Sequence, residues 1–318
     1  EFRRVLFRSN TIVVKKLTPA IICSLPSIFG NGAADDLNGK LSKNGSYFRY
    51  IQQKHNAVMK GIQLGKMLGN KLQLRNSDKT LKTTRLQTGK IDRRLVAQLG
   101  FDNANVFHRI VTDRYKNYFI HISIDASGSM SGASKFESAL MSAVAIAQAA
   151  SMTTGIRVQI SFRGTDTSIG NSNKDQCVTV YAYDSAHDKM SKIKSYFKYL
   201  DVFGCTPEGV AFRSIEKDIR QDAKGDEIIF INYSDGAPSE VDGIRYNGEE
   251  YTKQVINEFR ALGINIISYF IESSSWYDDG STRKFRYMYG PDSKFINPAN
   301  MSEIAKTINS KFLEVAIN

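Results

Sequence analysis

The residues best suited to chemistry in this chain lie in Asp125-Ala-Ser-Gly-Ser-Met130, directly after the apolar run Tyr118–Ile124. That run has the length and the Ile and aromatic content of a buried strand, and a glycine turn follows it. One carboxylate and two hydroxyls, from Asp125, Ser127 and Ser129, therefore stand at the end of a strand, where open α/β sheets bind their ligands. Such hard oxygen donors suit Mg²⁺ or Mn²⁺. The alternative is that these residues only form a turn and cap the next helix.

Two later segments supply further oxygen atoms. Thr206 stands just before an expected helix that opens with Pro207, and a second apolar strand ends at Asp235. If the two strands are neighbours whose helices leave on opposite faces, Asp125 and Asp235 meet at the point where the strand order reverses. The sequence thus predicts one metal site made by Asp125, Ser127, Ser129, Thr206 and Asp235.

The elements that would position this site alternate between strand and helix patterns, which is typical of a parallel sheet with crossover helices. We predict a doubly wound, mostly parallel α/β sheet with one short antiparallel edge strand at 176–182. The expected strands are 117–124, 156–163, 176–182, 226–233, 264–271 and 294–297. The expected helices are 135–153, 187–199, 207–222, 248–262 and 301–314.

The residues before this region are expected to form a smaller, basic, mostly helical part spanning 10–116. Residues 1–9 look like adapter or cloning sequence, and 10–40 are expected to be irregular. Residues 45–73 show helical spacing, with Gly61, Gly65 and Gly69 on one face, which favours close packing against another helix. Residues 74–116 are expected to be a basic connector with a short helix near 92–99.

The net charge of +11 is concentrated in this first part. Residues 1–120 contain 22 Lys and Arg against 7 Asp and Glu, whereas residues 121–318 contain 21 against 25. A basic region of this kind can bind nucleic acid or an acidic protein surface. Because it shows no nucleic-acid fingerprint and no interleaved aromatic residues, we favour a protein partner or a solvated helical face.

The motif Asp-x-Ser-x-Ser, a later Thr and a Ser-Asp-Gly after another strand together resemble the metal-ion-dependent adhesion site of von Willebrand factor A (VWA) domains. All five positions are present, at Asp125, Ser127, Ser129, Thr206 and Asp235, and the resemblance spans about residues 115–318. It implies a VWA fold in which these residues hold a divalent cation, directly or through water. The open position on the cation would accept an Asp or Glu carboxylate from another protein.

A narrower resemblance is to the T subunit of aerobic cobaltochelatase and its phage-borne relatives. It depends on Ser234-Asp-Gly-Ala-Pro238, on Leu86–Arg94 and Asn105–Arg109 before the A domain, and on Arg283–Tyr289 after the fifth strand. The long acidic stretch common in that family before the A domain is missing here. The resemblance implies a cytoplasmic adaptor for an AAA+ ATPase, with cobalt insertion into a corrinoid ring, in cobalamin biosynthesis, as the family reaction.

The alternatives are a free-standing VWA binding module without an ATPase partner and a nucleic-acid-associated protein using the basic region.

The four histidines have no ligand or triad spacing and no glycine-rich phosphate loop is present, so we expect no intrinsic catalysis. The three cysteines, Cys23, Cys177 and Cys205, lack zinc-site spacing and favour a reducing cytosol. The apolar segment 17–29 is too short to span a membrane, and no membrane partner is expected.

The segment 272–292 follows the strand expected at 264–271 and is rich in aromatic residues and arginine, which are enriched in protein interfaces. We expect a loop that forms a partner-contact rim beside the metal site. An equally reasonable interpretation is a loop packed on its own domain. The candidate contact residues are Trp276, Tyr277, Arg283, Phe285, Arg286 and Tyr287.

Overall fold

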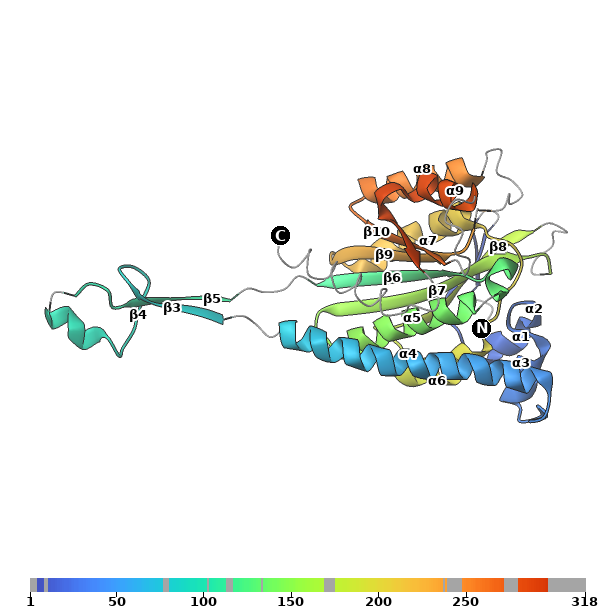
Figure 1. Ribbon diagram of the computed structural model, residues 1–318, viewed down its shortest axis with the longest axis horizontal. Coiled ribbons are helices and arrows are strands. Elements are labelled where there is room, and N and C mark those ends of the chain that lie inside the picture. Colours follow the sequence, from blue (N-terminus) through green and yellow to red (C-terminus); the bar gives the residue numbers. More distant parts are fainter. Residues whose placement is uncertain are drawn as a thin grey trace.

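The computed structural model describes residues 5–8, 11–76, 80–101, 103–112, 117–132, 134–168, 175–236, 238, 248–271 and 280–296. These residues form a body around an eight-stranded sheet and an arm that carries a separate three-stranded sheet. Figure 1 shows the arm projecting from the body.

Strand β6 lies at the centre of the large sheet. The sheet contains β6 (Tyr118–Asp125), β7 (Ile156–Asp166), β8 (Gln176–Asp184), β9 (Glu227–Ser234), β10 (Asn265–Ile271) and β11 (Ser293–Ile296), in the order β8-β7-β6-β9-β10-β11. All of these pairs are parallel except β7 with β8. Every residue of β6 is buried, as expected for a parallel strand covered on both faces. The strand order reverses between β6 and β9, as the predicted doubly wound fold requires.

Helices cover both faces of this sheet (Figure 1). One face packs against α5 (Lys135–Ser151), α6 (Met190–Tyr196) and the long α4 (Ser46–Asn76). The other face packs against α7 (Glu208–Ala223), α8 (Gly248–Ala261) and α9 (Gly280–Tyr289). The strands and helices expected between 117 and 271, and the final strand, are confirmed to within a few residues. The helix expected at 301–314 lies outside the described residues.

The prediction that residues 10–40 are irregular is wrong. Residues 11–14 form β2 (Thr11–Val14), and three short helices follow: α1 (Pro19–Ser24), α2 (Pro26–Phe29) and α3 (Asn31–Leu37). The β-branched run at 11–14 suits a buried strand. The two prolines begin helices instead of breaking one, because proline lacks only an amide that the first turn leaves unpaired. Thr18 caps α1 through the Ile21 amide.

The prediction that 176–182 is a short edge strand is also wrong. β8 is antiparallel to β7, as expected, but β2 pairs in parallel with its other side, and β1 (Val5–Arg8) pairs with β2. The strand β2 satisfies backbone groups that an edge strand would leave open. The backbone of residues 5–8 is thus part of the sheet, and their expected origin as cloning sequence stays a prediction.

The expected close helix packing is confirmed, and it joins the N-terminal part to the α/β core. A Cβ at Gly61 would lie 2.6 Å from the Met141 carbonyl oxygen, and a Cβ at Gly65 would lie 2.5 Å from that of Ala145. Side chains of β2 and α4 belong to the same core cluster as α5. The structure therefore differs from the predicted division at residue 116, because 11–76 and the α/β region share one core.

The projecting arm consists of β3 (Thr80–Leu86), β4 (Lys90–Ile91), β5 (Phe107–Thr112) and a short 3₁₀ helix at Val96–Phe101. The strand order is β3-β5-β4, with antiparallel pairs. The sequence led us to expect a connector with a helix near 92–99, so the sheet is a finding of the structure. Charged residues interrupt β3 and β5, and β4 has only two residues, which weakens a strand pattern.

Among the described residues, no helix combines the length and apolar character needed to cross a bilayer.

Candidate metal centre

The buried carboxylate of Asp125 joins two adjacent strand ends. Asp125 is the last residue of β6 and is completely buried. Its Oδ1 accepts a hydrogen bond from the Ser127 amide at 2.9 Å, and its Oδ2 accepts one from the Ser234 hydroxyl at 3.1 Å. Ser234 is the last residue of β9, so this contact links the two strand ends at the point where the order of the sheet reverses.

The two site serines connect this turn to Asp235. The Oγ atoms of Ser127 and Ser129 lie 3.0 Å apart, and the Ser129 hydroxyl donates to Asp235 Oδ1 at 2.8 Å. The other carboxylate oxygen, Oδ2, accepts from Lys135 Nζ at 2.8 Å. Ser129 is exposed, whereas Ser127 and Asp235 are buried. Four predicted ligand residues thus form one connected group of oxygen atoms with solvent on one side.

Thr206 lies on a loop that is hydrogen-bonded to the serine turn through Phe203 and Gly204. The Phe203 amide donates to the Ala126 carbonyl at 2.5 Å, and the Gly128 amide donates to the Gly204 carbonyl at 3.0 Å. Gly204 has φ +59°, and a Cβ there would lie 2.0 Å from the Thr165 carbonyl oxygen, so the loop needs glycine at this position. Thr206 itself is buried. The loop that carries Thr206 thus lies beside the serine turn, and the role of Thr206 as a fifth ligand stays a prediction.

A buried ion-pair network lies beneath the site. Arg163, in the middle of β7, is fully buried and donates to Glu208 Oε1 at 2.8 Å. The same guanidinium lies 4.0 Å from Asp125 Oδ2 and donates to the Ser123 hydroxyl at 3.1 Å. Asn232 adds a second donor to Glu208 Oε1, at 2.9 Å. Such buried charges are retained only when they are paired.

The sequence interpretation missed this network, although a signal was present. Arg163 interrupts the apolar run of a strand that we read as buried, and Glu208 opens the helix just after Thr206. A charged residue inside a buried strand needs a counter-charge, and here Glu208, the first residue of α7, supplies it. Lys135, the cation beside Asp235, was read only as the start of a helix.

Burial dominates the electrostatics of the inner carboxylates. It raises the pKa of Asp125 and that of Glu208 above their ordinary values, while the Arg163 guanidinium beside both opposes the rise. A cation bound next to Asp125 would favour its ionised form for the same Coulombic reason.

The donor set fits a hard divalent cation. It consists of carboxylate and hydroxyl oxygens only, gathered at the edge where parallel sheets bind ligands. Because the set contains only two carboxylates, they would do no more than balance the charge of a divalent cation, and the hydroxyls add no further negative charge. Asp125, Ser127, Ser129, Thr206 and Asp235 are the residues that would hold it, directly or through water.

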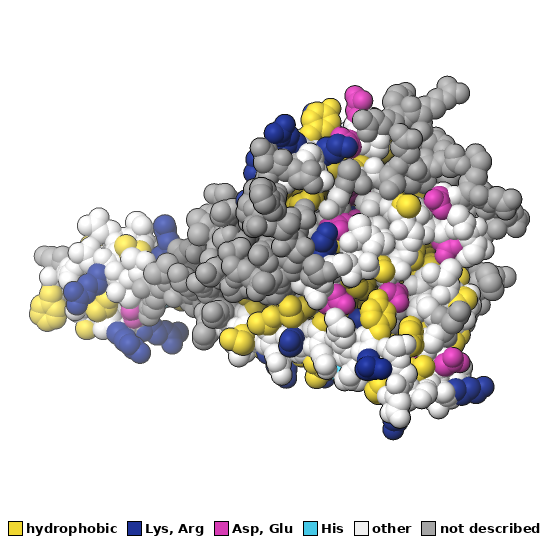
Figure 2. Space-filling view, turned by 45° about the vertical axis from the view of Figure 1, so that its right-hand side comes forward, with side chains coloured by type: hydrophobic (Ala, Val, Ile, Leu, Met, Phe, Trp, Pro, Cys, Tyr) yellow, Lys and Arg dark blue, Asp and Glu magenta, His cyan; other side chains and the backbone are white. Residues whose placement is uncertain are grey.

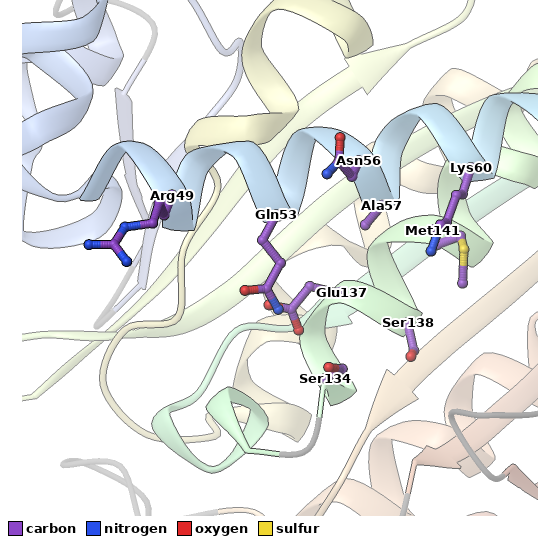
Figure 3. A pocket seen from close by; sticks show the side chains of 9 residues that line it. All are labelled: Arg49, Gln53, Asn56, Ala57, Lys60, Ser134, Glu137, Ser138 and Met141. Atoms are coloured by element: carbon purple, nitrogen blue, oxygen red, sulfur yellow. The ribbon is translucent and has the colours of Figure 1, made fainter. Parts of the chain in front are cut away.

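A polar groove lies beside this centre, between α4 and the first turns of α5, with a volume of about 410 Å³. Figure 3 shows the side chains of Gln53 and Glu137 close together in it. Ser134, on its wall, directly precedes Lys135. The polar side chains that α4 contributes are those of Arg49, Gln53, Asn56 and Lys60.

The expected partner-contact rim is corrected by the structure. Residues 280–289 form the amphipathic helix α9, and Phe285 is fully buried against Phe270 and Tyr289, so it cannot contact a partner. Aromatic residues in this segment serve the core because α9 covers the outer part of the sheet. Trp276 and Tyr277 lie outside the described residues. The remaining candidates, Arg283, Arg286 and Tyr287, are exposed on α9.

Comparison with solved structures finds several proteins of similar structure at low sequence identity. The chain is similar to the pilus adhesin SpaC from Lactobacillus rhamnosus GG in its open conformation (12% identity, 66% of this chain and 32% of that chain, TM-score 0.47). It is also similar to the manganese-loaded TRAP protein of Plasmodium vivax (12% identity, 60% of this chain and 73% of that chain, TM-score 0.43). A third similar structure is the vWF domain of the type V pilus tip protein Mfa5 from Porphyromonas gingivalis (11% identity, 62% of this chain and 97% of that chain, TM-score 0.44).

The chain thus spans about a third of the length of the adhesin SpaC. No family model and no curated protein matches the sequence. At these identities and TM-scores, the likeness adds nothing to what the strand order and the site residues themselves establish about the fold. That fold is the doubly wound, mostly parallel α/β sheet predicted for a VWA-like protein.

Proposed function

We propose that this protein is a metal-dependent protein-binding module of the VWA class. The observation that carries the proposal is the connected oxygen cluster of Asp125, Ser127, Ser129 and Asp235 at the switch point of the sheet. A divalent cation, when bound there, supplies a positively charged coordination position for an Asp or Glu carboxylate of the partner. The chain's own residues hold the ligand oxygens in place and leave Ser129 open to solvent.

The polar groove between α4 and α5 extends the proposed binding surface. Ser134, which lines the groove, directly precedes Lys135, and Lys135 contacts Asp235 of the metal centre. Gln53 and Asn56 are among the residues that line a space large enough for a few side chains of a partner segment, and Figure 3 shows Gln53 extending into it toward Glu137. We propose that residues flanking the partner's carboxylate lie in this groove.

The partner that we propose is an AAA+ ATPase, as in the T subunit of aerobic cobaltochelatase, which the chain resembles. The motif behind this resemblance, Leu86–Arg94, falls on the arm. There Gly89 and Asp92 build the turn: a Cβ at Gly89 would lie 2.8 Å from the His108 carbonyl oxygen, and Asp92 Oδ1 accepts from the Arg94 amide at 3.2 Å. Lys90, Arg93 and Arg94 are left exposed for a partner.

The arm presents both charged and apolar groups, as Figure 2 shows. Its exposed cations include Arg85, Lys90, Arg93, Arg94 and Arg109. Its exposed apolar side chains are Ile91, Val96, Leu99, Phe101 and Ile110. Exposed apolar side chains mixed with cations suit an acidic protein surface, whose interface would bury the apolar groups and pair the cations.

The proposal is tested by a pull-down of the AAA+ ATPase encoded nearest to this chain, with Mg²⁺ and with EDTA. We expect retention of the ATPase only with Mg²⁺. Asp125→Ala should reduce retention by at least about tenfold, because the site without this ligand no longer holds the metal ion that binds the partner carboxylate. Circular dichroism controls for folding of the variant. Equal retention by Asp125→Ala and in EDTA would contradict the metal-dependent role.

If the ATPase encoded nearest to this chain binds equally well with and without metal, we would infer that the arm is its binding surface. In that case, Arg93→Glu combined with Arg94→Glu should abolish binding while Asp125→Ala does not. Binding of DNA or RNA that falls steeply with salt would instead favour the nucleic-acid alternative.

A further inference from the structure

Lys135 places a cation of the protein itself in contact with a predicted metal ligand. It is the first residue of α5, and its Nζ lies 2.8 Å from Asp235 Oδ2. The ion pair is shielded from solvent, since the side chains of Lys135 and Asp235 are only 14% and 1% exposed. Because Ser129 donates to the other oxygen, both oxygens of Asp235 have partners within the chain.

We propose that Lys135 is a positioning and charge-compensating residue that makes the site bind a metal ion weakly by itself and strongly together with a partner carboxylate. This inference rests on the proposed metal-dependent function and adds the order in which its components assemble. Lys135 holds Asp235 in the hydrogen bond with Ser129 and offsets the charge that would otherwise attract the cation.

Arg163 is a second cation on the inner side of the site, but its charge is compensated by the Glu208 carboxylate. Its guanidinium lies 4.0 Å from Asp125 Oδ2 and pairs with Glu208 at 2.8 Å. Each of the two carboxylates that would attract a metal thus has a cation of the chain nearby. An incoming divalent cation is attracted by the two carboxylates and repelled by the Lys135 ammonium that contacts Asp235, so Lys135 reduces the net attraction.

A partner carboxylate changes this balance. Its negative charge interacts favourably with the metal ion and also with the Lys135 ammonium, which lies at the same edge. Two ligands that each stabilise the binding of the other show reciprocal coupling. The site would therefore stay largely metal-free until a partner arrives, and metal and partner would be released together.

The experiment is titration of Mg²⁺ by calorimetry, and of Mn²⁺ by electron paramagnetic resonance, into the full chain without any partner. For Lys135→Met we expect the dissociation constant to fall by about tenfold or more, because one nearby positive charge is removed. Lys135→Arg retains the charge and should stay within about threefold of the wild type. Thermal unfolding checks that each variant is folded.

A matched control is available in Lys192→Met. Lys192 pairs with Asp188 at the same 2.8 Å and is similarly shielded, with side chains 10% and 8% exposed, but it lies on α6 and not at the site. Its removal should leave metal affinity unchanged. Sodium acetate, as a simple carboxylate, should raise the Mn²⁺ affinity of the wild type more than that of Lys135→Met, with sodium chloride at equal ionic strength as reference.

The outcomes separate this inference from the function on which it rests. Equal or weaker metal binding by Lys135→Met, with binding still lost in Asp125→Ala, would overturn the role of Lys135 and leave the metal site standing. If neither the wild type nor Lys135→Met binds Mg²⁺ or Mn²⁺ at any concentration tested, the metal-dependent function fails and this inference fails with it.

Discussion

At the scale of single residues, the centre is defined by hydrogen bonds that hold each oxygen in place before any ligand arrives. Asp125 is fixed by the Ser127 amide and the Ser234 hydroxyl, and Asp235 by Ser129 and Lys135. Such preorganisation lowers the entropic cost of binding, because these side chains are already ordered. The same strand β6 also contains a titratable residue that has no part in the site.

His121 sits inside β6 and is completely buried. Its Nδ1 lies 2.9 Å from Gln159 Oε1, its Nε2 lies 2.9 Å from Ser161 Oγ, and its ring stacks on Phe230. Burial lowers the pKa of His121 to about 4. This agrees with the interpretation of His121 as a hydrogen-bonded core residue.

We predict a pH dependence of stability from His121. The pKa of about 4 in the folded protein lies below the ordinary histidine value of 6.5, so as the pH falls the unfolded chain binds the extra proton first. The contribution of neutral His121 to the free energy of unfolding is complete above pH 6.5. It is lost as the pH falls toward 4, by about 3 kcal/mol in total. Urea unfolding between pH 7 and pH 4.5 measures it.

The comparison needs two variants. His121→Gln should show a shallower loss of unfolding free energy across this pH range than the wild type, whatever its stability at neutral pH. His187→Gln replaces an imidazole that is 76% exposed and should keep the wild-type slope. Parallel curves for all three proteins would contradict the prediction.

At the scale of elements, the helix pair α4–α5 holds the first turn of α5, with Lys135 and Ser134, beside the metal centre. Its close approach depends on glycine: at Gly65 an added Cβ would lie 2.5 Å from the Ala145 carbonyl oxygen and 2.6 Å from the Gln148 Cβ. Both neighbours are parts of α5 that cannot rotate away. The helices would have to move apart to admit a methyl group.

We predict that Gly65→Ala destabilises the protein by about 1–3 kcal/mol, since overpacking costs this much even though alanine favours a helix. The measurement is the midpoint and slope of chemical unfolding. Gly100→Ala is the control, because a Cβ there meets nothing within 4 Å and should change stability little. A neutral or stabilising Gly65→Ala would show that the helix pair can adjust.

At the scale of the whole molecule, residues 11–76 belong to the same folding unit as the α/β region, while the arm does not. Ile12, Val14, Ile51 and Val58 are buried in the cluster that includes the inner face of the sheet and α5. The strands of the arm pair with each other, and Phe101 near its end is 85% exposed. The body should therefore tolerate loss of the arm better than loss of its N-terminal part.

This difference predicts the outcome of two deletions. Replacing residues 77–116 by a flexible Gly/Ser linker of about 10–15 residues should leave a cooperative unfolding transition, because few core contacts are lost. A chain beginning at residue 117 should lack such a transition, because α5 and β8 lose their cover. Circular dichroism melts and near-ultraviolet spectra of both proteins provide the readout. A well-folded chain from 117 onward would restore the division that we first predicted.

The sequence was most informative where local pattern and burial agree. The central strands are continuous apolar runs, which parallel strands covered on both faces require, and the five oxygen-bearing residues stand directly beside strand or helix ends. It was least informative where partners are distant in the chain. β2 pairs with β8 across more than a hundred residues, and nothing local in Thr11–Val14 identifies that neighbour.

The amino-acid sequence by itself indicated the α/β class, the strands and helices of the core and the candidate ligand residues, because these follow from periodicity and short motifs, whereas the pairing of β6 with β9 came from the tertiary structure. Only the tertiary structure decided that α9 is packed on the sheet with Phe285 inside, that 11–76 completes the core, and that Arg163 and Lys135 lie beside the carboxylates. Those facts depend on long-range packing and on buried charges finding partners far away in the chain, which no local pattern encodes.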